Sequence, residues 1–321
     1  MRSVVFSQHG PASRVVALED RPRPRPGAGE VLVRVRARPV NPSDELFIEG
    51  RYGRRPTLPA VPGFEGVGTV EETTTGRLDV GQRVALSSRG TWQEYVAVPD
   101  TDVIPVPDGL ADPVACQLTI NPLTALLLTR QLALRGGDWL LITAAGSALS
   151  RMILHLAHRD HVRCVCVVRS GGHDDLVRAG AAAVVDTTTD DLVGRVRDLT
   201  DGQGVHAVLD AVGGEPGSTA LRCLRDGGRA VALGMFDGGM ITVDPRALLF
   251  GDVTVRGFWL PHQLSLQTAE VRAELTERAL DLLGTADFAA PVAATYDLAD
   301  VITALDHVHR PGRRGKVILT G

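Results

Sequence analysis

The 321-residue sequence has little of what marks membrane, secreted or nucleic-acid-binding proteins. It contains no run of eighteen or more apolar residues, so we expect no transmembrane helix. The first residues, MRSVVFSQHGPAS, have no apolar core before small cleavage-site residues, which predicts no secretion signal and a cytoplasmic location. A net charge of −4 gives no general basic field to attract nucleic acid or anionic lipid. We therefore expect a small molecule as the partner, with no nucleic acid and no membrane.

Cysteine is scarce, and metal-ligand patterns are missing. The four cysteines lie at positions 116, 164, 166 and 223. Their spacing fits neither a disulfide framework nor a zinc knuckle. His155, His158 and His161 follow at three-residue steps that drift around a helix, so we interpret them as solvated or packed side chains. The sequence predicts no metal site.

The chain is about twice as long as a typical single domain, and its hydrophobic pattern changes near Asp112. Before that point, short alternating strands are separated by Gly and Pro clusters: VLVRVRA, GVGTVEE, QRVALSS and EYVAV. After it, nearly all-apolar strands alternate with helical stretches: DWLLIT, VRCVCVV, AAVVD, HAVLDAV, RAVALG and TVRGFW. This pattern predicts an α/β protein with a β-rich domain at 1–112 and a doubly wound nucleotide-binding domain at 113–287. By analogy with similar chains, the tail at 288–321, which ends in KVILTG, rejoins the first domain.

The segment DWLLITAAGSALSRMILHLA predicts a strand, a loop of small residues and a helix. Backbone amides and the positive end of the helix dipole would face a pyrophosphate there, and small side chains would let it approach. Of the glycines in the usual G-x-G-x-x-G motif, Gly146 is present, whereas Ala and Ser occupy the neighbouring positions. We predict that Gly146, Ser147, Ala148 and Leu149 bind the cofactor. The alternative is a tight strand–helix turn without a ligand.

The end of the second strand of the nucleotide-binding domain carries a basic residue. An acidic residue there would bind the ribose hydroxyls of NAD, but this chain has Arg169. A guanidinium pairs well with a 2′-phosphate, which predicts NADPH as the cofactor. The alternative is an ordinary surface arginine at a strand end.

The order of the two domains, together with the segment Pro62–Gly68 (PGFEGVG), resembles the medium-chain dehydrogenase/reductase superfamily. The resemblance implies a GroES-like catalytic domain followed by a Rossmann domain. In the zinc alcohol dehydrogenases of this superfamily, a histidine ligand stands at the position of Phe64. Phenylalanine cannot bind zinc, and the cysteine ligand expected near Asn41 is missing, as is the four-cysteine lobe. We therefore expect a zinc-independent member, whose chemistry shifts from alcohols toward activated C=C bonds.

Within the superfamily, the chain resembles the 2-enoyl thioester reductases of the quinone-oxidoreductase-like branch. The motifs that carry this resemblance are NPSD at 41–44, EGRYG at 49–53, LTINPLTA at 118–125, VVR at 167–169, VGG at 212–214 and RGFWL at 256–260. Their order and spacing cover nearly the whole chain. The resemblance implies NADPH-dependent reduction of the C=C bond of an acyl thioester.

The same resemblance implies a set of site residues. Tyr52 and Asn41 would be catalytic, with Tyr52 donating a proton or hydrogen bond near the substrate carbonyl. The substrate pocket would contain Tyr52, Asn121, Phe258 and Trp259. Beyond the four loop residues and Arg169, the cofactor would contact Asn41, Thr124, Val212, Gly213, Met235, Phe236, Phe258 and Trp259.

Plainer alternatives exist for several of these residues. Tyr52 could lie in an ordinary loop, folded onto apolar neighbours. Asn41 and Asn121 both precede proline and could be turn or cap residues. Phe258 and Trp259 could belong to the core or to a dimer interface, since relatives commonly pair the last strand in a homodimer. At the level of function, a quinone or enone reductase and a non-catalytic NADPH-binding sensor stay open.

Overall fold

The computed structural model describes residues 1–169, 171, 173–285, 288 and 290–321. The chain divides into two compact units, Met1–Pro122 with Thr276–Gly321 (unit 1) and Leu123–Leu275 (unit 2). The first segment of unit 1 ends at Pro122, ten residues after the boundary expected at Asp112. Asp112 is the first residue of helix α3 (Asp112–Ala115). Asp112 forms ion pairs with Arg36 at 2.9 Å and Arg83 at 2.7 Å, which attach this helix to the strands of unit 1.

Unit 2 contains a six-stranded sheet in the order β10-β9-β8-β11-β12-β13. Every neighbouring pair is parallel. The strands are β8 (Trp139–Ile142), β9 (Arg163–Val168), β10 (Ala183–Asp186), β11 (Val205–Asp210), β12 (Leu224–Ala232) and β13 (Thr254–Gly257). This is the doubly wound order of a Rossmann domain. The six strands predicted from the apolar runs are thus confirmed.

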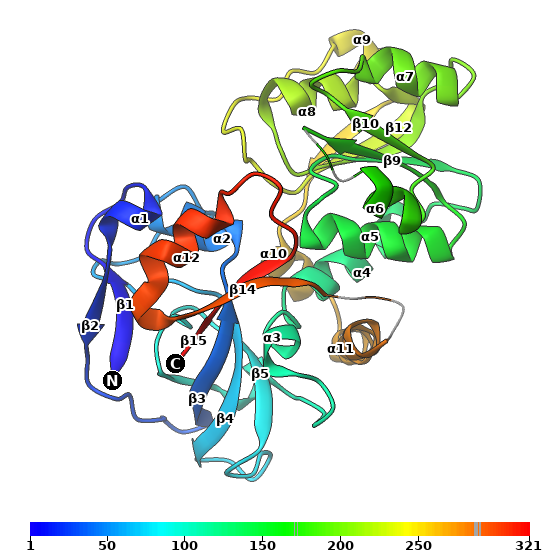
Figure 1. Cartoon of the computed structure of the whole chain (residues 1–321). Coiled ribbons are helices and arrows are strands. Elements are labelled where there is room, and N and C mark those ends of the chain that lie inside the picture. Colours follow the sequence, from blue (N-terminus) through cyan, green and yellow to red (C-terminus); the bar gives the residue numbers. More distant parts are fainter. Residues whose placement is uncertain (170, 172, 286–287, 289) are drawn as a thin grey trace. The chain divides into compact units, whose positions relative to one another are not determined.

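Helices cover both faces of this sheet, which explains why its strands are apolar. Figure 1 shows α5 (Ala148–Arg159) and α6 (His173–Arg178) on one face, and α7 (Leu192–Leu199) and α8 (Gly214–Leu221) on the other. The remaining helices that begin in or next to unit 2 are α4 (Asn121–Leu132), α9 (Pro245–Leu249), α10 (Leu260–Ser265) and α11 (Ala269–Gly284). Leu141, Val165 and Val208 are fully buried in the core between these layers.

Unit 1 is built on a sheet in the order β14-β15-β3-β4-β5-β7, with β6 also paired to β3. Its strands are β3 (Glu30–Pro39), β4 (Glu65–Thr73), β5 (Arg83–Ser87), β6 (Tyr95–Pro99), β7 (Val103–Pro105), β14 (Val292–Asp297) and β15 (Lys316–Thr320). Figure 1 shows the late strand β15 beside the early strand β3, and Ile318 pairs with Pro39 in an antiparallel register. The chain therefore returns to unit 1 after unit 2.

The rest of unit 1 packs around this sheet. A two-stranded sheet is formed by β1 (Arg2–Phe6) and β2 (Val16–Asp20), and short helical turns are α1 (Ala12–Val15), η1 (Asp100–Asp102) and η2 (Leu298–Asp300). Helices α2 (Pro42–Ile48) and α12 (Val301–Val308) lie side by side (Figure 1), joined by a 2.6 Å contact between Glu45 and His309. Both helices contribute to one apolar core.

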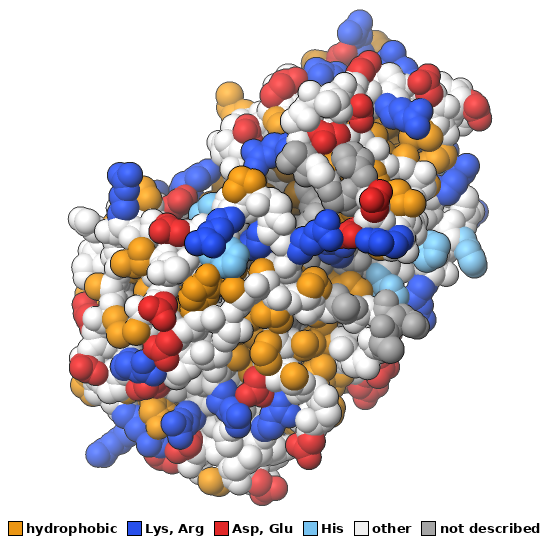
Figure 2. Space-filling model, in the orientation of Figure 1, with side chains coloured by type: hydrophobic (Ala, Val, Ile, Leu, Met, Phe, Trp, Pro, Cys, Tyr) orange, Lys and Arg blue, Asp and Glu red, His pale blue; other side chains and the backbone are white. Residues whose placement is uncertain are grey.

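The surface carries charges of both signs. Figure 2 shows acidic and basic side chains interspersed over the visible face of each unit. Among the described residues, no helix is both long and apolar enough to cross a bilayer.

Candidate functional site

Three strand ends meet in unit 1. Strand β3 runs antiparallel to both β4 and β15, so the end of β3 lies beside the beginnings of the other two. Asn41 follows β3, whereas Glu65 begins β4 and Lys316 begins β15. Residues separated by up to 275 positions in the sequence are thus brought into contact.

These three residues form a buried polar network. The ammonium group of Lys316 donates a hydrogen bond to Oδ1 of Asn41, and Nδ2 of Asn41 donates to Oε1 of Glu65 at 2.9 Å. The other carboxylate oxygen of Glu65 accepts from Thr119 N at 3.2 Å and Ile120 N at 3.1 Å. Glu65 is 1% exposed and Lys316 is 7% exposed, so water does little to screen their charges.

Burial shifts the titration of the charged groups in this network. It raises the pKa of Glu65, while the charge of Lys316 and the hydrogen bonds from Asn41 and Thr119 oppose the shift. It also lowers the pKa of Lys316, which Glu65 and Asp44 oppose. Nearby, burial raises the pKa of Asp44 well above its usual value, although its Oδ2 accepts a 2.7 Å hydrogen bond from Asn41 N. Lys316 and Glu65 are linked through the side chain of Asn41, so their titration depends on the hydrogen bonds around them.

The network constrains what Asn41 can do. Its side chain is 3% exposed, and both polar atoms are bound within unit 1. One N–H and one lone pair are left for any other partner. Asn41 also caps helix α2, because its carbonyl accepts from Asp44 N at 3.0 Å. Asn41 is thus the N-cap residue of α2, and its contact with a cofactor stays a prediction.

Tyr52 lies in the loop after α2 and packs on aromatic rings. Its backbone N–H donates to the carbonyl of Leu46 at 3.0 Å, which folds the loop back onto the helix. Its ring centroid is 4.9 Å from that of Phe64 and 6.5 Å from that of Phe47, and the latter two are 5.2 Å apart. Tyr52 does fold onto apolar neighbours, as the plainer alternative held, yet its side chain stays partly exposed. The ring of Tyr52 is therefore packed against its neighbours, and the residue as a whole is partly exposed.

The position that the resemblance assigns to a zinc ligand is occupied by an aromatic residue in unit 1. Phe64 belongs to this aromatic cluster, and among the described residues no three His, Cys, Asp or Glu side chains lie close enough together to hold a metal ion. The residues present therefore do not fit zinc.

Asn121 and Thr124, which the sequence places together, belong to different units. Asn121 begins helix α4, is 7% exposed, and its Nδ2 has no hydrogen-bond partner among the described residues. Thr124 is 6% exposed, in the same helix. A ligand that reached Asn121 would satisfy its amide.

The loop between β8 and α5 has the properties of a phosphate-binding turn. Ser147 caps α5 by accepting a 3.1 Å hydrogen bond from Ser150 N. Gly146 is exposed, and a Cβ placed on it would meet no atom within 4 Å, so the space beside the loop is open. Ala148 and Leu149 are partly exposed, and their amides, in the first helical turn, have no carbonyl four residues earlier within the helix. These residues fit the pyrophosphate of a dinucleotide.

A buried aspartate, which sequence reasoning missed, organises the next loop. Asp210 ends β11 and is fully buried. Its carboxylate accepts from Thr143 Oγ1 at 2.8 Å, Val212 N at 3.0 Å and Gly213 N at 2.9 Å. The signal available in the sequence was an acidic residue within the apolar run HAVLDAV. Asp210 thus holds the predicted Val212–Gly213 segment beside the end of β8.

The other predicted residues of unit 2 lie at the same edge of the sheet, because the carboxyl ends of parallel strands share an edge. Arg169 follows β9 and is exposed. Met235 and Phe236 follow β12 and are 45% and 59% exposed. Their loop is joined to the loop after β11 by a hydrogen bond of 2.8 Å from Asp237 N to Val212 O. After β13 come Phe258, which is 9% exposed, and Trp259, which is partly exposed.

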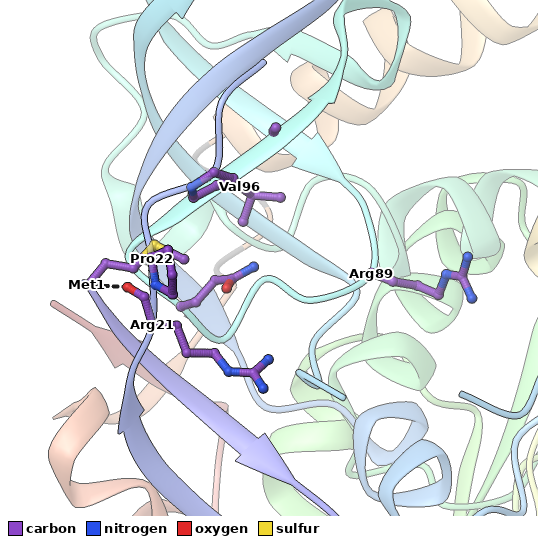
Figure 3. Close-up of a pocket in the computed structure, with 8 residues that line it drawn as sticks. Met1, Arg21, Pro22, Arg89 and Val96 are labelled. Carbon is purple, nitrogen blue, oxygen red and sulfur yellow. Dashed lines mark hydrogen bonds between the residues drawn. The ribbon is translucent and has the colours of Figure 1, made fainter. Parts of the chain in front are cut away.

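A separate hollow lies on the surface of unit 1. Its volume is about 470 Å³, and Met1, Arg21, Arg89 and Val96 are among its lining residues (Figure 3). The amino group of Met1 donates to the carbonyl of Arg21 at 2.8 Å on its wall. None of the predicted site residues lines it, so we do not assign the reaction to it.

Comparisons with known proteins agree with this two-part architecture. The family model described as "Alcohol dehydrogenase GroES-like domain" matches residues 27–108, and the one described as "Zinc-binding dehydrogenase" matches residues 148–282. The predicted combination of a GroES-like and a Rossmann domain is thus confirmed.

Individual relatives resemble the whole chain. The mitochondrial enoyl-[acyl-carrier-protein] reductase of Bos taurus is 30% identical over 100% of this chain and 88% of its own. A mycobacterial protein whose structure was solved in complex with NADPH is 30% identical to this chain. The match covers 100% of both chains, with a TM-score of 0.90. A quinone oxidoreductase of Pseudomonas syringae pv. Tomato is 26% identical over 100% of this chain and 99% of its own, with a TM-score of 0.91.

Proposed function

Because the chain belongs to the medium-chain dehydrogenase/reductase superfamily, in its quinone-oxidoreductase-like branch, we propose that it is an NADPH-dependent reductase of activated C=C bonds. The proposed substrate is a 2-enoyl thioester. A solved relative that binds NADPH, together with Arg169 at the end of β9, supports this cofactor. When bound, NADPH supplies the hydride that the β-carbon of the substrate accepts.

The observation that carries the proposal is the packed, partly exposed side chain of Tyr52, in a unit whose described residues do not fit zinc. Hydride addition at the β-carbon leaves negative charge on the thioester oxygen, and the hydroxyl of Tyr52 stabilises that charge by donating a hydrogen bond. The α-carbon then takes a proton, which Tyr52 can supply. A thioester suits this arrangement because it provides both the conjugated double bond and the oxygen.

In unit 2, the cofactor's pyrophosphate would lie against Gly146–Leu149, and its 2′-phosphate would pair with Arg169. Asp210 would keep the Val212–Gly213 turn in place beside it. The roles proposed for Thr124, Met235, Phe236, Phe258 and Trp259 follow the same resemblance. The expected cytoplasmic location and homodimer likewise stay predictions.

A quinone reductase is the second candidate, favoured by the quinone oxidoreductase among the solved neighbours. Reduction of a quinone needs no proton at a carbon, so it does not require Tyr52. The two candidates therefore differ in how strongly they depend on this one hydroxyl.

The deciding experiment measures NADPH oxidation with crotonyl-CoA and with a simple quinone, for the wild type and Tyr52→Phe. We expect turnover of the thioester, and a kcat about a hundredfold lower or more in the variant, the range for loss of a proton or oxyanion donor. Tyr95→Phe, the same change on strand β6 of unit 1, is the matched control and should behave as the wild type. Turnover of the quinone alone, with Tyr52→Phe fully active, would replace the proposal with the second candidate.

A further inference from the structure

We infer that Phe64 is a positioning residue for Tyr52: its ring holds the tyrosine ring in the orientation from which the hydroxyl reaches the substrate. The inference rests on the proposed function, because it assumes that Tyr52 acts on the substrate. Phe64 stands where the zinc-dependent members of the superfamily carry a metal ligand. In this chain, the same position would then serve the reaction by packing instead of by coordination.

Four aromatic rings of unit 1 pack together at this place. The sequence has only three tryptophans, three tyrosines and seven phenylalanines. Four of these rings form a continuous chain of contacts: Phe6 lies 5.8 Å from Phe47, Phe47 5.2 Å from Phe64, and Phe64 4.9 Å from Tyr52. The Phe64–Tyr52 pair has an interplanar angle of 37°, and its centroid separation is the shortest in the chain of contacts. Within this group of four rings, Phe64 lies nearer to Tyr52 than Phe47 does.

Phe64 stands on a rigid part of unit 1. Its carbonyl accepts from Ser88 N at 3.0 Å, and the next residue is Glu65, whose carboxylate is held by the buried network. The preceding residue, Gly63, has a φ of +97°, and a Cβ there would lie 2.4 Å from Cδ1 of Trp92. Glycine is therefore required for the turn that delivers Phe64 to this position.

Tyr52, by contrast, stands on the loop between α2 and β4. Backbone hydrogen bonds fix the loop at its two ends, from Tyr52 N to Leu46 O at 3.0 Å and from Ala60 N to Phe6 O at 3.0 Å. Between them, Gly53, Arg54 and Arg55 are exposed. The 4.9 Å contact with Phe64 therefore joins the tyrosine ring to the beginning of β4. A hydroxyl that is displaced by about 1 Å loses much of its catalytic effect.

The test begins with Phe64→Leu, which keeps the site apolar but removes the ring, and with Phe64→Tyr, which retains a ring. We expect Phe64→Leu to lower kcat on crotonyl-CoA about 2- to 12-fold with little change in KM, the range that aromatic pair energies correspond to. Phe64→Tyr should restore most of the activity. Phe6→Leu, which removes the ring that lies against Phe47 at 5.8 Å, is the matched control for stability and should leave kcat near that of the wild type.

A double variant separates positioning from a general loss of structure. If Phe64 acts through Tyr52, Phe64→Leu added to Tyr52→Phe lowers kcat no further. A second readout needs no cofactor or substrate: trypsin should cleave after Arg51 and Arg54 faster in Phe64→Leu than in Phe64→Tyr or Phe6→Leu, because the loop has lost its support.

The outcomes distinguish the inference from the proposed function. If Tyr52→Phe retains full thioester activity, the function proposed for Tyr52 is wrong, and the inference falls with it. If Tyr52→Phe is inactive but Phe64→Leu turns over like the wild type, only the inference is wrong. An additive loss in the double variant, with unchanged cleavage by trypsin, would show that Phe64 acts independently of Tyr52 and would likewise overturn it.

Discussion

Replacement of Lys316 by methionine tests whether the buried network holds unit 1 together. Methionine has nearly the length of lysine and fills the same space, so the change removes a charge without opening a large cavity. It leaves Glu65 buried without its cationic neighbour and leaves Oδ1 of Asn41 without its donor. Removal of one of two opposite buried charges leaves the other uncompensated, which typically costs about 3–5 kcal/mol in the free energy of unfolding. At about 2–4 °C per kcal/mol, the melting temperature should fall by roughly 6–20 °C.

The loss should depend on pH in a defined direction. Burial raises the pKa of Glu65, and the charge of Lys316 opposes this rise, so the pKa should be higher still in the variant. A carboxyl whose folded-state pKa is raised favours the folded state when protonated. Its contribution is fully present below the unfolded value of about 4.5 and is lost as the pH rises through the folded pKa. The destabilisation should therefore be larger at neutral pH than at mildly acidic pH.

Urea unfolding of the wild type, Lys316→Met, Glu65→Gln and the double variant, at neutral and mildly acidic pH, measures both effects. The double variant keeps no buried charge from this pair, so it should be more stable at neutral pH than the sum of the two single losses predicts. Our reasoning would be refuted by a Lys316→Met protein within about 1 kcal/mol of the wild type at neutral pH, below the range for a broken buried pair. A loss that stays constant between the two pH values would refute the electrostatic part.

Two further predictions concern the cofactor and the acid stability of unit 1. Arg169→Ala should raise the Kd for NADPH roughly 10- to 100-fold, the range for loss of a charge-assisted hydrogen bond, and leave the Kd for NADH unchanged. Equal weakening of NADPH and NADH binding would contradict the assignment. Arg159→Ala is the control variant. The pKa of Asp297 is lowered by the N–H of Ala299 and further by Arg2, at 2.7 Å. Because a depressed carboxyl pKa adds stability only above the unfolded value of about 3.8, Asp297→Asn should lower the melting temperature at pH 7 and match the wild type in strong acid; a difference that persists in acid would contradict this.

Much of the fold could be predicted because its signals are local. Each strand of the unit 2 sheet is an apolar run bounded by turns, and the predicted residues after β8, β9, β11, β12 and β13 do share one edge of that sheet. The division between the two units lies ten residues after the change of pattern near Asp112. The ion pairs that attach α3 to unit 1 join residues far apart in the sequence and leave no local pattern.

The polar network of unit 1 could not be predicted for the same reason. Glu65 and Lys316 look like ordinary charged residues at the beginnings of strands, and only the antiparallel register of β3 with β4 and β15 brings them to Asn41. Asp210 was missed because an acid at the end of an apolar run is also typical of a turn. The aromatic support of Tyr52 likewise appears only when the loop after α2 is placed beside β4.

The place of β15 in the sheet of unit 1 has a consequence for synthesis on the ribosome. Lys316 is translated 275 residues after Asn41, when all of unit 2 has already emerged. Domains tend to fold as units while the chain grows, so unit 2 can reach its native structure first. Until β15 arrives, the nascent unit 1 has an open sheet edge at β3 and a buried glutamate without its cation. We expect chaperones that bind unpaired strand edges to bind the nascent chain at β3. Mutations that weaken the network should then lower the yield of folded protein more than the activity of each folded molecule.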